Sequence, residues 1–176
     1  MLLRGDMDAL PLQEDTGESC TSELDGAMHA CGHDGHTAML AGAAHLLADR
    51  RRELAGRVLF MFQPGEENGS RGALHMLDEG LLDVPVHAVD GSASPVVAAY
   101  ALHLTPNAPT GAVVSKPGPL MASSDRITIT VTGRGGHASD PSRALDPIPV
   151  ACEVVQALQT MVTRTIDVFD PGIVTI

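Results

Sequence analysis

Residues 29–36 crowd a thiol, three imidazoles and a carboxylate into one short run, His-Ala-Cys-Gly-His-Asp-Gly-His. Two adjacent carboxylates, Glu66 and Glu67, come directly after a Pro-Gly turn further along the chain. Imidazole, thiolate and carboxylate are the ligand set of a transition-metal site. A second carboxylate beside a ligating one is what metal-assisted hydrolysis needs as a general base. The two motifs therefore predict a metal-dependent hydrolase, and they require a fold that brings them together.

The segments around these motifs predict an alternation of strands and helices. Strands are predicted at residues 2–7, 58–62 and 96–104, and helices at residues 35–52 and 72–79. The strands are short apolar runs, whereas the helices carry apolar residues at helical spacing. Asp34 is expected to cap the first helix, three arginines at 50–52 suit its last turn, and Gly80 follows the second helix. This alternation predicts an α/β fold with polar motifs at the ends of its strands.

A different pattern begins after the Lys-Pro-Gly-Pro segment that starts at Lys116. Residues 125–134 alternate apolar and polar side chains, which predicts a half-exposed strand. Residues 147–164 predict an amphipathic helix, and residues 172–176 are expected to start another strand. Strand, helix and strand are too few to close a core by themselves, so this α+β region is predicted to be part of a smaller domain.

Charge and composition exclude several classes of partner. The net charge is −11, from 22 acidic and 11 basic residues, and no basic stripe is interleaved with aromatic residues, so nucleic acid is not expected to bind. No apolar run approaches the roughly 20 residues of a membrane span, and the first residues lack the apolar segment of a signal peptide. No membrane association is therefore expected. The three cysteines are irregularly spaced and do not form a disulfide framework, which predicts a cytoplasmic location.

Cys31 and His33 lie two positions apart at the start of the predicted first helix, where both can reach one metal ion. The helix N-terminus is expected to lower the pKa of the thiol and so to favour the thiolate that binds metal. The alternative is a packed thiol beside an unrelated histidine. Of the two flanking histidines, His29 and His36, at least one is expected to lie outside the ligand set.

Glu66 and Glu67 cannot serve one centre in the same way, because the side chains of neighbouring residues diverge. This divergence suits a division of labour in which one carboxylate coordinates a metal and the other faces the attacking water. The alternative is a solvated acidic turn. The position of the pair, after a buried strand and a Pro-Gly turn at a sheet edge, favours the functional interpretation.

Four further residues have both a functional and a structural interpretation. His103 comes at a third strand end and is a ligand candidate, although a histidine among apolar residues is more often a hydrogen-bonded core residue. Asp6 and Asp8 can each orient a ligating imidazole or cap a loop. His137, beside three glycines, can donate a hydrogen bond to a developing oxyanion or lie in a plain exposed turn.

Five stretches of the chain match, in order and in rough spacing, the motifs of one enzyme family. They are Arg-Gly-Asp-Met-Asp-Ala-Leu-Pro from Arg4, the run from His29 to Met39, Gln-Pro-Gly-Glu-Glu from Gln63, Leu-His-Leu around His103 and Gly-Arg-Gly-Gly-His-Ala from Gly133. With these stretches the chain resembles the amidohydrolase branch of the aminoacylase/carboxypeptidase metallopeptidases. That branch includes hippurate hydrolase and the plant enzymes that cleave indole-acetyl amino acids.

The resemblance implies a role for each candidate residue. The metal ligands would be Cys31, His33, Glu67 and His103. Glu66 would be the general base, and Asp8 would be the orienting aspartate. His137 would reach the substrate, in this family often across a dimer. Residues 1–115 would form part of the catalytic metal-binding domain, and residues 116–176 part of a lid or dimerisation domain.

The implied reaction is hydrolysis of the amide bond of an N-acyl amino acid, such as hippurate or an N-acetyl amino acid, by metal-activated water. Two divalent ions are expected, and the thiolate favours zinc, cobalt or nickel without excluding manganese. A homodimer is expected for the full-length protein. Dipeptidase or carboxypeptidase activity and deacetylation of N-acetyl-diamino acids are alternatives within the same family.

Family members run to about twice the length of this chain and supply a last ligating histidine in the part that follows residue 176. We therefore expect a fragment with weak or no activity of its own. Two non-enzymatic alternatives remain open: a truncated paralogue that at most binds metal or a partner, and a structural zinc module built on Cys31 and His33.

Overall fold

The first part of the chain folds around a small parallel sheet. The computed structural model describes residues 1–83, 95–170 and 172–176. The strands are β1 (Leu2–Asp6), β2 (Leu59–Gln63) and β3 (Ala99–Ala101), hydrogen-bonded in the order β2-β1-β3 with both pairs parallel. The register pairs Leu2 with Leu59 on one side and with Ala99 on the other. β1 is therefore the central strand, and Asp6 at its carboxyl end lies beside the end of β2, while β3 ends beside Arg4.

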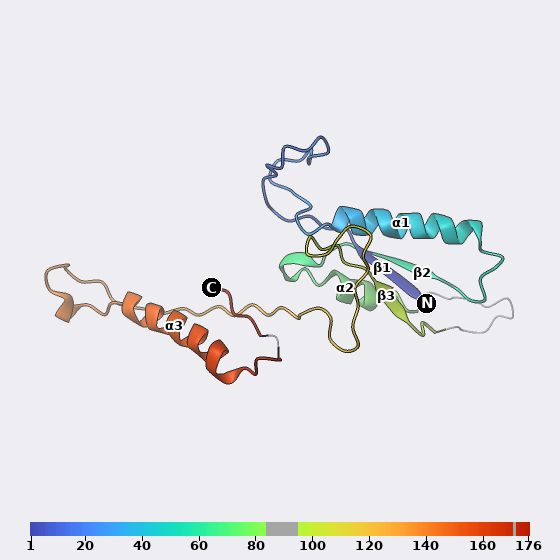
Figure 1. Cartoon of the computed structure of the whole chain (residues 1–176). Coiled ribbons are helices and arrows are strands. Elements are labelled where there is room, and N and C mark those ends of the chain that lie inside the picture. Colours follow the sequence, from blue (N-terminus) through green and yellow to red (C-terminus); the bar gives the residue numbers. More distant parts are fainter. Residues whose placement is uncertain (84–94, 171) are drawn as a thin grey trace. The chain divides into compact units, whose positions relative to one another are not determined.

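Two helices accompany this sheet, as Figure 1 shows. Helix α1 (His33–Asp49) follows β1 in the chain and packs against β1 and β2, and helix α2 (Gly72–Asp78) contacts β2. The buried apolar side chains include Leu2 from β1, Leu40 from α1 and Met61 from β2. A helix that crosses between parallel strands and buries one apolar face against them is the basic unit of α/β proteins. The predicted α/β class is confirmed.

The ends of the helices differ in part from the prediction. Helix α1 begins at His33 with Gly32 in the N-cap position, so the prediction that Asp34 caps the helix is wrong. Asp34 lies in the first turn, where its charge still suits the positive end of the helix dipole. The helix ends at Asp49, before the three arginines that were expected in its last turn. Gly80 does close α2: its φ is 86°, its amide donates to Leu77 O at 3.0 Å, and the next amide donates to Met76 O at 2.9 Å.

The chain divides into two compact units, Met1–Gly111 and Ala112–Ile176. The second unit contains a short 3₁₀ turn, Pro141–Arg143, and helix α3 (Ile148–Thr165), which confirms the helix predicted at 147–164. The strands predicted at 125–134 and 172–176 are wrong, because these residues pair with no neighbouring strand in the described part of the chain apart from one bridge between Arg134 and Leu145. The roles predicted for the two regions, catalytic and lid or dimerisation, stay predictions.

Within the residues that the model describes, no helix has both the length and the apolar character needed to cross a lipid bilayer.

Candidate metal centre

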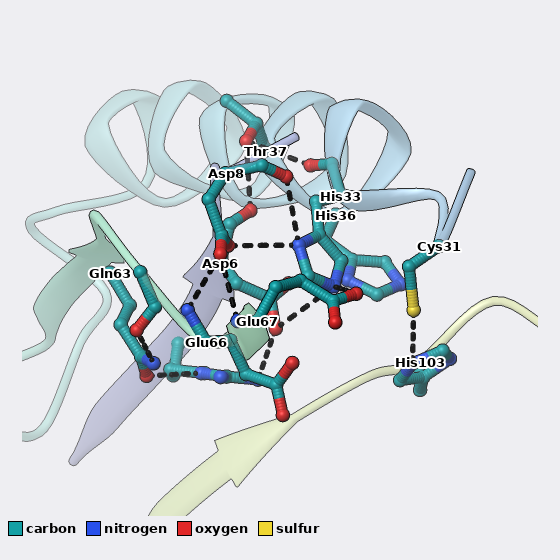
Figure 2. A network of polar contacts seen from close by, with 12 residues as sticks. Asp6, Asp8, Cys31, His33, His36, Thr37, Gln63, Glu66, Glu67 and His103 are labelled. Carbon is teal, nitrogen blue, oxygen red and sulfur yellow. Dashed lines mark hydrogen bonds and ion pairs between the residues drawn. The ribbon is translucent and has the colours of Figure 1, made fainter. Parts of the chain in front are cut away.

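The carboxyl ends of the three strands meet at one edge of the sheet, and the predicted site residues gather there. Asp6 ends β1, the Glu66–Glu67 pair follows β2, and His103 follows β3. The N-terminus of α1 brings Cys31 and His33 to the same edge. Figure 2 shows these side chains grouped beside the first turn of α1.

His33 is at the centre of this group. Its side chain is 1% exposed, and its Nδ1 donates to the Asp8 carboxylate and to the Asp8 carbonyl, each at 3.0 Å. Both partners are acceptors, so the proton of a neutral ring is on Nδ1 and Nε2 carries a lone pair. Nε2 is buried without a hydrogen-bond partner, 3.6 Å from Asp6 Oδ2 and 4.0 Å from Glu67 Oε1. A lone pair buried in this way beside carboxylates is the environment of a metal ligand.

Three sets of possible ligand atoms share His33, and the atoms of each set lie within 4.8 Å of one another. The sets are Cys31–His33–His103, His33–Glu66–Glu67 and Asp6–His33–His36. The first two sets contain all four predicted ligands and the predicted general base. The structure thus brings together Cys31, His33, Glu66, Glu67 and His103.

Cys31 and His103 face each other, with Sγ and Nε2 3.5 Å apart. His103 Nδ1 lies against the carbonyl oxygen of Leu104, so it carries the proton and the lone pair of Nε2 faces Cys31 Sγ. The expected lowering of the Cys31 pKa is wrong. Burial, together with the nearby carboxylates of Glu67, Glu66 and Asp6, raises the pKa of the Cys31 thiol to about 11.

The carboxylate of Asp8 connects His33 to the Glu66–Glu67 turn. Its Oδ1 accepts from His33, while its Oδ2 accepts the amides of Glu66 at 2.8 Å and Glu67 at 2.9 Å. Partial burial acts to raise the pKa of Asp8, but the hydrogen bonds from the two amides and from His33 outweigh it and hold the pKa below its usual value. Asp8 is therefore an ionised acceptor that fixes both the imidazole and the acidic turn.

Asp6 has a similar position beside His36. Its Oδ1 accepts from His36 Nδ1 at 2.6 Å, and its Oδ2 pairs with Arg4 at 2.7 Å. Burial acts to raise the pKa of Asp6, and the contacts with His36, Arg4 and His33 bring it below its usual value. The two aspartates thus orient different imidazoles, Asp8 that of His33 and Asp6 that of His36.

Arg4 and Gln63 support the site, although neither was among the sequence candidates. Arg4 Nε donates to Gln63 Oε1 at 2.9 Å, and Gln63 Nε2 donates to Gly65 O at 2.7 Å. This chain of contacts links the end of β1 to the turn that carries the two glutamates. Their positions in the sequence give a partial signal, because each belongs to a motif stretch at the end of a strand.

Two of the histidines considered in the sequence analysis are exposed. His29 is exposed. His137 belongs to the second unit, is exposed, and forms a hydrogen bond of 2.8 Å between its Nδ1 and Ser139 Oγ. The predicted contact of His137 with substrate stays a prediction.

The donor set fits a divalent metal ion. Cys31, His33, Glu67 and His103 offer sulfur, nitrogen and oxygen, which zinc and its neighbours accept. Among the described residues, no arginine or lysine forms an ion pair with Glu66 or Glu67, so the charge of these carboxylates is not balanced within this part of the protein. A cation at this point would accept the buried lone pair of His33 and favour the thiolate of Cys31. It would also offset the negative charge of the carboxylates.

Known proteins have sequences similar to that of this chain. The chain is 44% identical over 174 residues to an N-acetylcysteine deacetylase of Bacillus subtilis, covering 99% of this chain and 43% of that protein. It is 42% identical to the IAA-amino acid hydrolase ILR1-like 5 of Arabidopsis thaliana, of which it covers 37%. The chain therefore spans less than half the length of these relatives.

A solved structure gives the same result for the fold. A crystal structure described as that of a candidate aminohydrolase from methicillin-resistant Staphylococcus aureus superposes with a TM-score of 0.71 at 36% sequence identity, covering 99% of this chain and 44% of the other. The sequence model of the peptidase family M20/M25/M40 matches residues 2–172. The family resemblance predicted from the motifs is confirmed, and the chain belongs to the peptidase family M20/M25/M40.

Proposed function

We propose that this chain forms much of the metal-binding region of an amidohydrolase that cleaves the amide bond of N-acyl amino acids. The observation that carries the proposal is the buried, unpartnered Nε2 of His33, which lies within reach of Cys31, Glu67 and His103. Two relatives point to the substrate class, since one is named a deacetylase of N-acetylcysteine and the other a hydrolase of IAA-amino acids.

Cys31, His33, Glu67 and His103 would hold two divalent ions, with zinc, cobalt, nickel and manganese as the candidates. Bound metal ions in such a site lower the pKa of water and polarise a carbonyl oxygen. The chain itself contributes the orientation of the ligands. Asp8 fixes the ring of His33 and the backbone of Glu67, and such supporting contacts set the direction in which a ligand presents its lone pair.

Glu66 would be the general base. Its amide is held by Asp8 while its side chain is exposed to solvent, so the carboxylate can meet a water molecule and a substrate. Glu66 would take a proton from the attacking water as the new C–O bond forms. It would then return that proton to the nitrogen as the C–N bond breaks, which releases a carboxylic acid and an amine.

The remaining parts of the proposal depend on the longer protein. His137 would donate a hydrogen bond to the substrate oxygen from the second unit. A homodimer and a cytoplasmic location are proposed for the same protein; the latter is supported by three free cysteines, Cys20, Cys31 and Cys152.

The test uses the protein made from the full reading frame that contains this chain. Purified wild type is assayed for bound metal and for hydrolysis of hippurate, N-acetyl amino acids and dipeptides. We expect Glu66→Ala to keep its metal and to lower kcat/KM for the preferred N-acyl amino acid by about 10²–10⁴-fold, because a positioned general base contributes that much. Glu18→Ala, which alters an exposed glutamate outside the site, is the matched control.

Three results would count against the proposal. Wild type without bound metal would exclude the metal centre. Metal retained with no hydrolysis of any substrate would favour a structural zinc module or an inactive paralogue. Preferential cleavage of unacylated dipeptides would favour a dipeptidase or carboxypeptidase.

A further inference from the structure

His36 is a buried imidazole at the site that the proposed mechanism does not use. Its side chain is 2% exposed in helix α1, and its ring centroid lies 5.3 Å from that of His33 and 4.7 Å from that of His103. It is also part of a possible ligand set with Asp6 and His33. The hydrogen bonds of its two ring nitrogens show whether His36 is available as a metal ligand.

Both ring nitrogens of His36 already have partners. Nδ1 lies 2.6 Å from Asp6 Oδ1, an acceptor, so Nδ1 carries a proton. Nε2 accepts the backbone amide of Leu104 at 2.8 Å, so its lone pair is in use. Arg4, at 2.7 Å, holds the other oxygen of Asp6. A ring with neither nitrogen free does not bind a metal, and His36 instead joins the end of β1 to the backbone of Leu104.

Leu104 directly follows the candidate ligand His103, in a segment with little other support. Strand β3 ends at Ala101, and residues 102–105 are exposed and belong to no helix or strand. The residue that holds the backbone of Leu104 therefore also sets where the neighbouring ring of His103 lies.

The side chain of Leu104 fits a notch in the start of α1. A Cβ atom added at Gly35 would lie 2.5 Å from Leu104 Cδ1, and one added at Gly32 would lie 3.3 Å from the same atom. The two glycines thus leave the space that Leu104 fills. The His36 hydrogen bond and this notch fix the backbone and the side chain of the same residue.

We propose that His36 is a positioning residue that holds Leu104, and through it places His103 at the metal centre. The contact with Asp6, whose other oxygen is held by Arg4, places the donor of His36 at Nδ1 and leaves Nε2 as the acceptor for Leu104. This inference rests on the proposed metal centre, since it concerns how the ligand from β3 is brought to the ligands from α1.

Two substitutions separate the two hydrogen bonds of His36. The amide group of Asn lies near the place of Nδ1, so His36→Asn can keep the bond to Asp6 and loses the acceptor for Leu104. The amide oxygen of Gln reaches the place of Nε2, so His36→Gln can keep the Leu104 bond and loses the donor to Asp6. His45→Ala, at an exposed histidine of the same helix, is the control.

The measurements are zinc content, the dissociation constant of zinc from chelator competition, and the absorption spectrum with cobalt in place of zinc. We expect His36→Asn to bind zinc about 10–100-fold more weakly, the usual effect of removing a group that supports a ligand. We expect His36→Gln and His45→Ala to stay close to wild type. In His36→Asn, the cobalt spectrum should keep the thiolate charge-transfer band of Cys31. Its ligand-field bands should change, because His103 is the ligand that is displaced.

Gly35→Ala tests whether the position of Leu104 matters by changing the space that its side chain fills. It also covers the case in which His36→Asn does not fold. Its new methyl group displaces the side chain of Leu104 and leaves the His36 ring itself unchanged, and a loss of zinc affinity is expected. Gly42→Ala, on the same helix with open space around it, is its control.

The outcomes distinguish this inference from the proposed function. Wild type that binds no zinc would overturn the metal centre itself. Wild-type zinc affinity in both His36→Asn and Gly35→Ala would overturn the inference and leave the metal centre intact. Weaker binding in His36→Gln than in His36→Asn would overturn it too, because His36 would then act by satisfying Asp6.

Discussion

The carboxylate of Asp8 connects two parts of the candidate site. It accepts hydrogen bonds from His33 and from the amides of Glu66 and Glu67, three residues from two other segments of the chain. Hydrogen bonds to an ionised acceptor are stronger than neutral ones, and removing the acceptor leaves all the donors unpaired. Asp8 therefore contributes both to the stability of unit Met1–Gly111 and to the orientation of the ligands.

We predict that Asp8→Asn lowers both stability and metal affinity. The asparagine keeps the size of the side chain but offers one acceptor oxygen in place of two, so either His33 or the two amides of the Glu66–Glu67 turn lose their acceptor. The expected cost is about 1.5–3 kcal/mol in the free energy of unfolding without metal, and about 10–100-fold in zinc affinity. Chemical denaturation and chelator competition measure the two effects, with Asp15→Asn at an exposed loop position as control. Unchanged zinc affinity in Asp8→Asn would contradict the orienting role.

The sequence could predict the chemistry of these residues but not their pairing. Asp6 and Asp8 are two positions apart after the same apolar run, so each was equally able to orient an imidazole or to cap a loop. Which histidine each one meets depends on how α1 packs on β1, which a pattern along the chain does not contain. The same is true of the Cys31 pKa. The helix N-terminus, which was expected to lower this pKa, is visible in the sequence, whereas the burial and the carboxylates of Asp6, Glu66 and Glu67 that raise it depend on how other segments pack around the thiol.

At the scale of elements, the turn between β2 and α2 brings two backbone segments into close contact. The amide of Gly72 donates to Gly65 O at 2.9 Å, and the same oxygen accepts from Gln63. A Cβ atom at Gly72 would lie 2.3 Å from Gly65 O and 2.6 Å from Gly65 N. These neighbours are backbone atoms that cannot move aside independently. The contact between the two glycines thus closes the loop that presents the two glutamates.

We predict that Gly72→Ala opens this loop. The backbone must shift to relieve the clash, which we expect to lower the free energy of unfolding by about 1–3 kcal/mol, the usual range for overpacking. Zinc affinity should fall as well, because Glu67 lies on the loop. Gly42→Ala removes a glycine from α1 where a Cβ meets nothing, and should stabilise the protein by up to about 1 kcal/mol. Denaturation curves of the two variants and of wild type measure these changes. A Gly72→Ala variant as stable as wild type would show that the turn tolerates a side chain.

The elements that the sequence predicted well are those whose pattern and partners lie close along the chain. The apolar runs of β1 and β2 and the helix α1 between them form one β-α-β unit, and their predicted positions agree with the structure within a few residues. Residues 125–134 carry an equally regular alternation, yet Ile127 is 82% exposed and the segment has no strand beside it among the described residues. Alternation shows that a segment is suited to a sheet, but a strand forms only where another strand accepts its hydrogen bonds.

For the molecule as a whole, the net charge is negative, and several of its carboxylates lie where the strand ends meet. The net charge of −11 includes Glu66 and Glu67 at the sheet edge, and the thiol of Cys31 beside them becomes an anion only when it is deprotonated. A cation can bind these groups together in the folded state, and this binding site is lost when the chain unfolds. Any ligand that binds the folded state alone stabilises it in proportion to the logarithm of its concentration relative to its dissociation constant. Metal binding should therefore be visible as a change in global stability.

We predict that zinc raises the thermal stability of the protein and that the gain grows with pH. Without metal the pKa of Cys31 is about 11, so the thiol is protonated from pH 7.5 to 9, and binding as thiolate must release that proton. One released proton makes binding tenfold tighter per pH unit. At a fixed excess of zinc, the stabilisation then increases by about 1.4 kcal/mol per pH unit. Imidazole ordinarily titrates near pH 6.5, below this window, so the thiol is the group whose protonation changes the zinc affinity there.

Calorimetric melting with zinc and with chelator at several pH values measures the gain. Cys31→Ser should show a smaller gain without this slope, and a wild-type gain that is constant from pH 7.5 to 9 would show that Cys31 does not bind the metal as a thiolate.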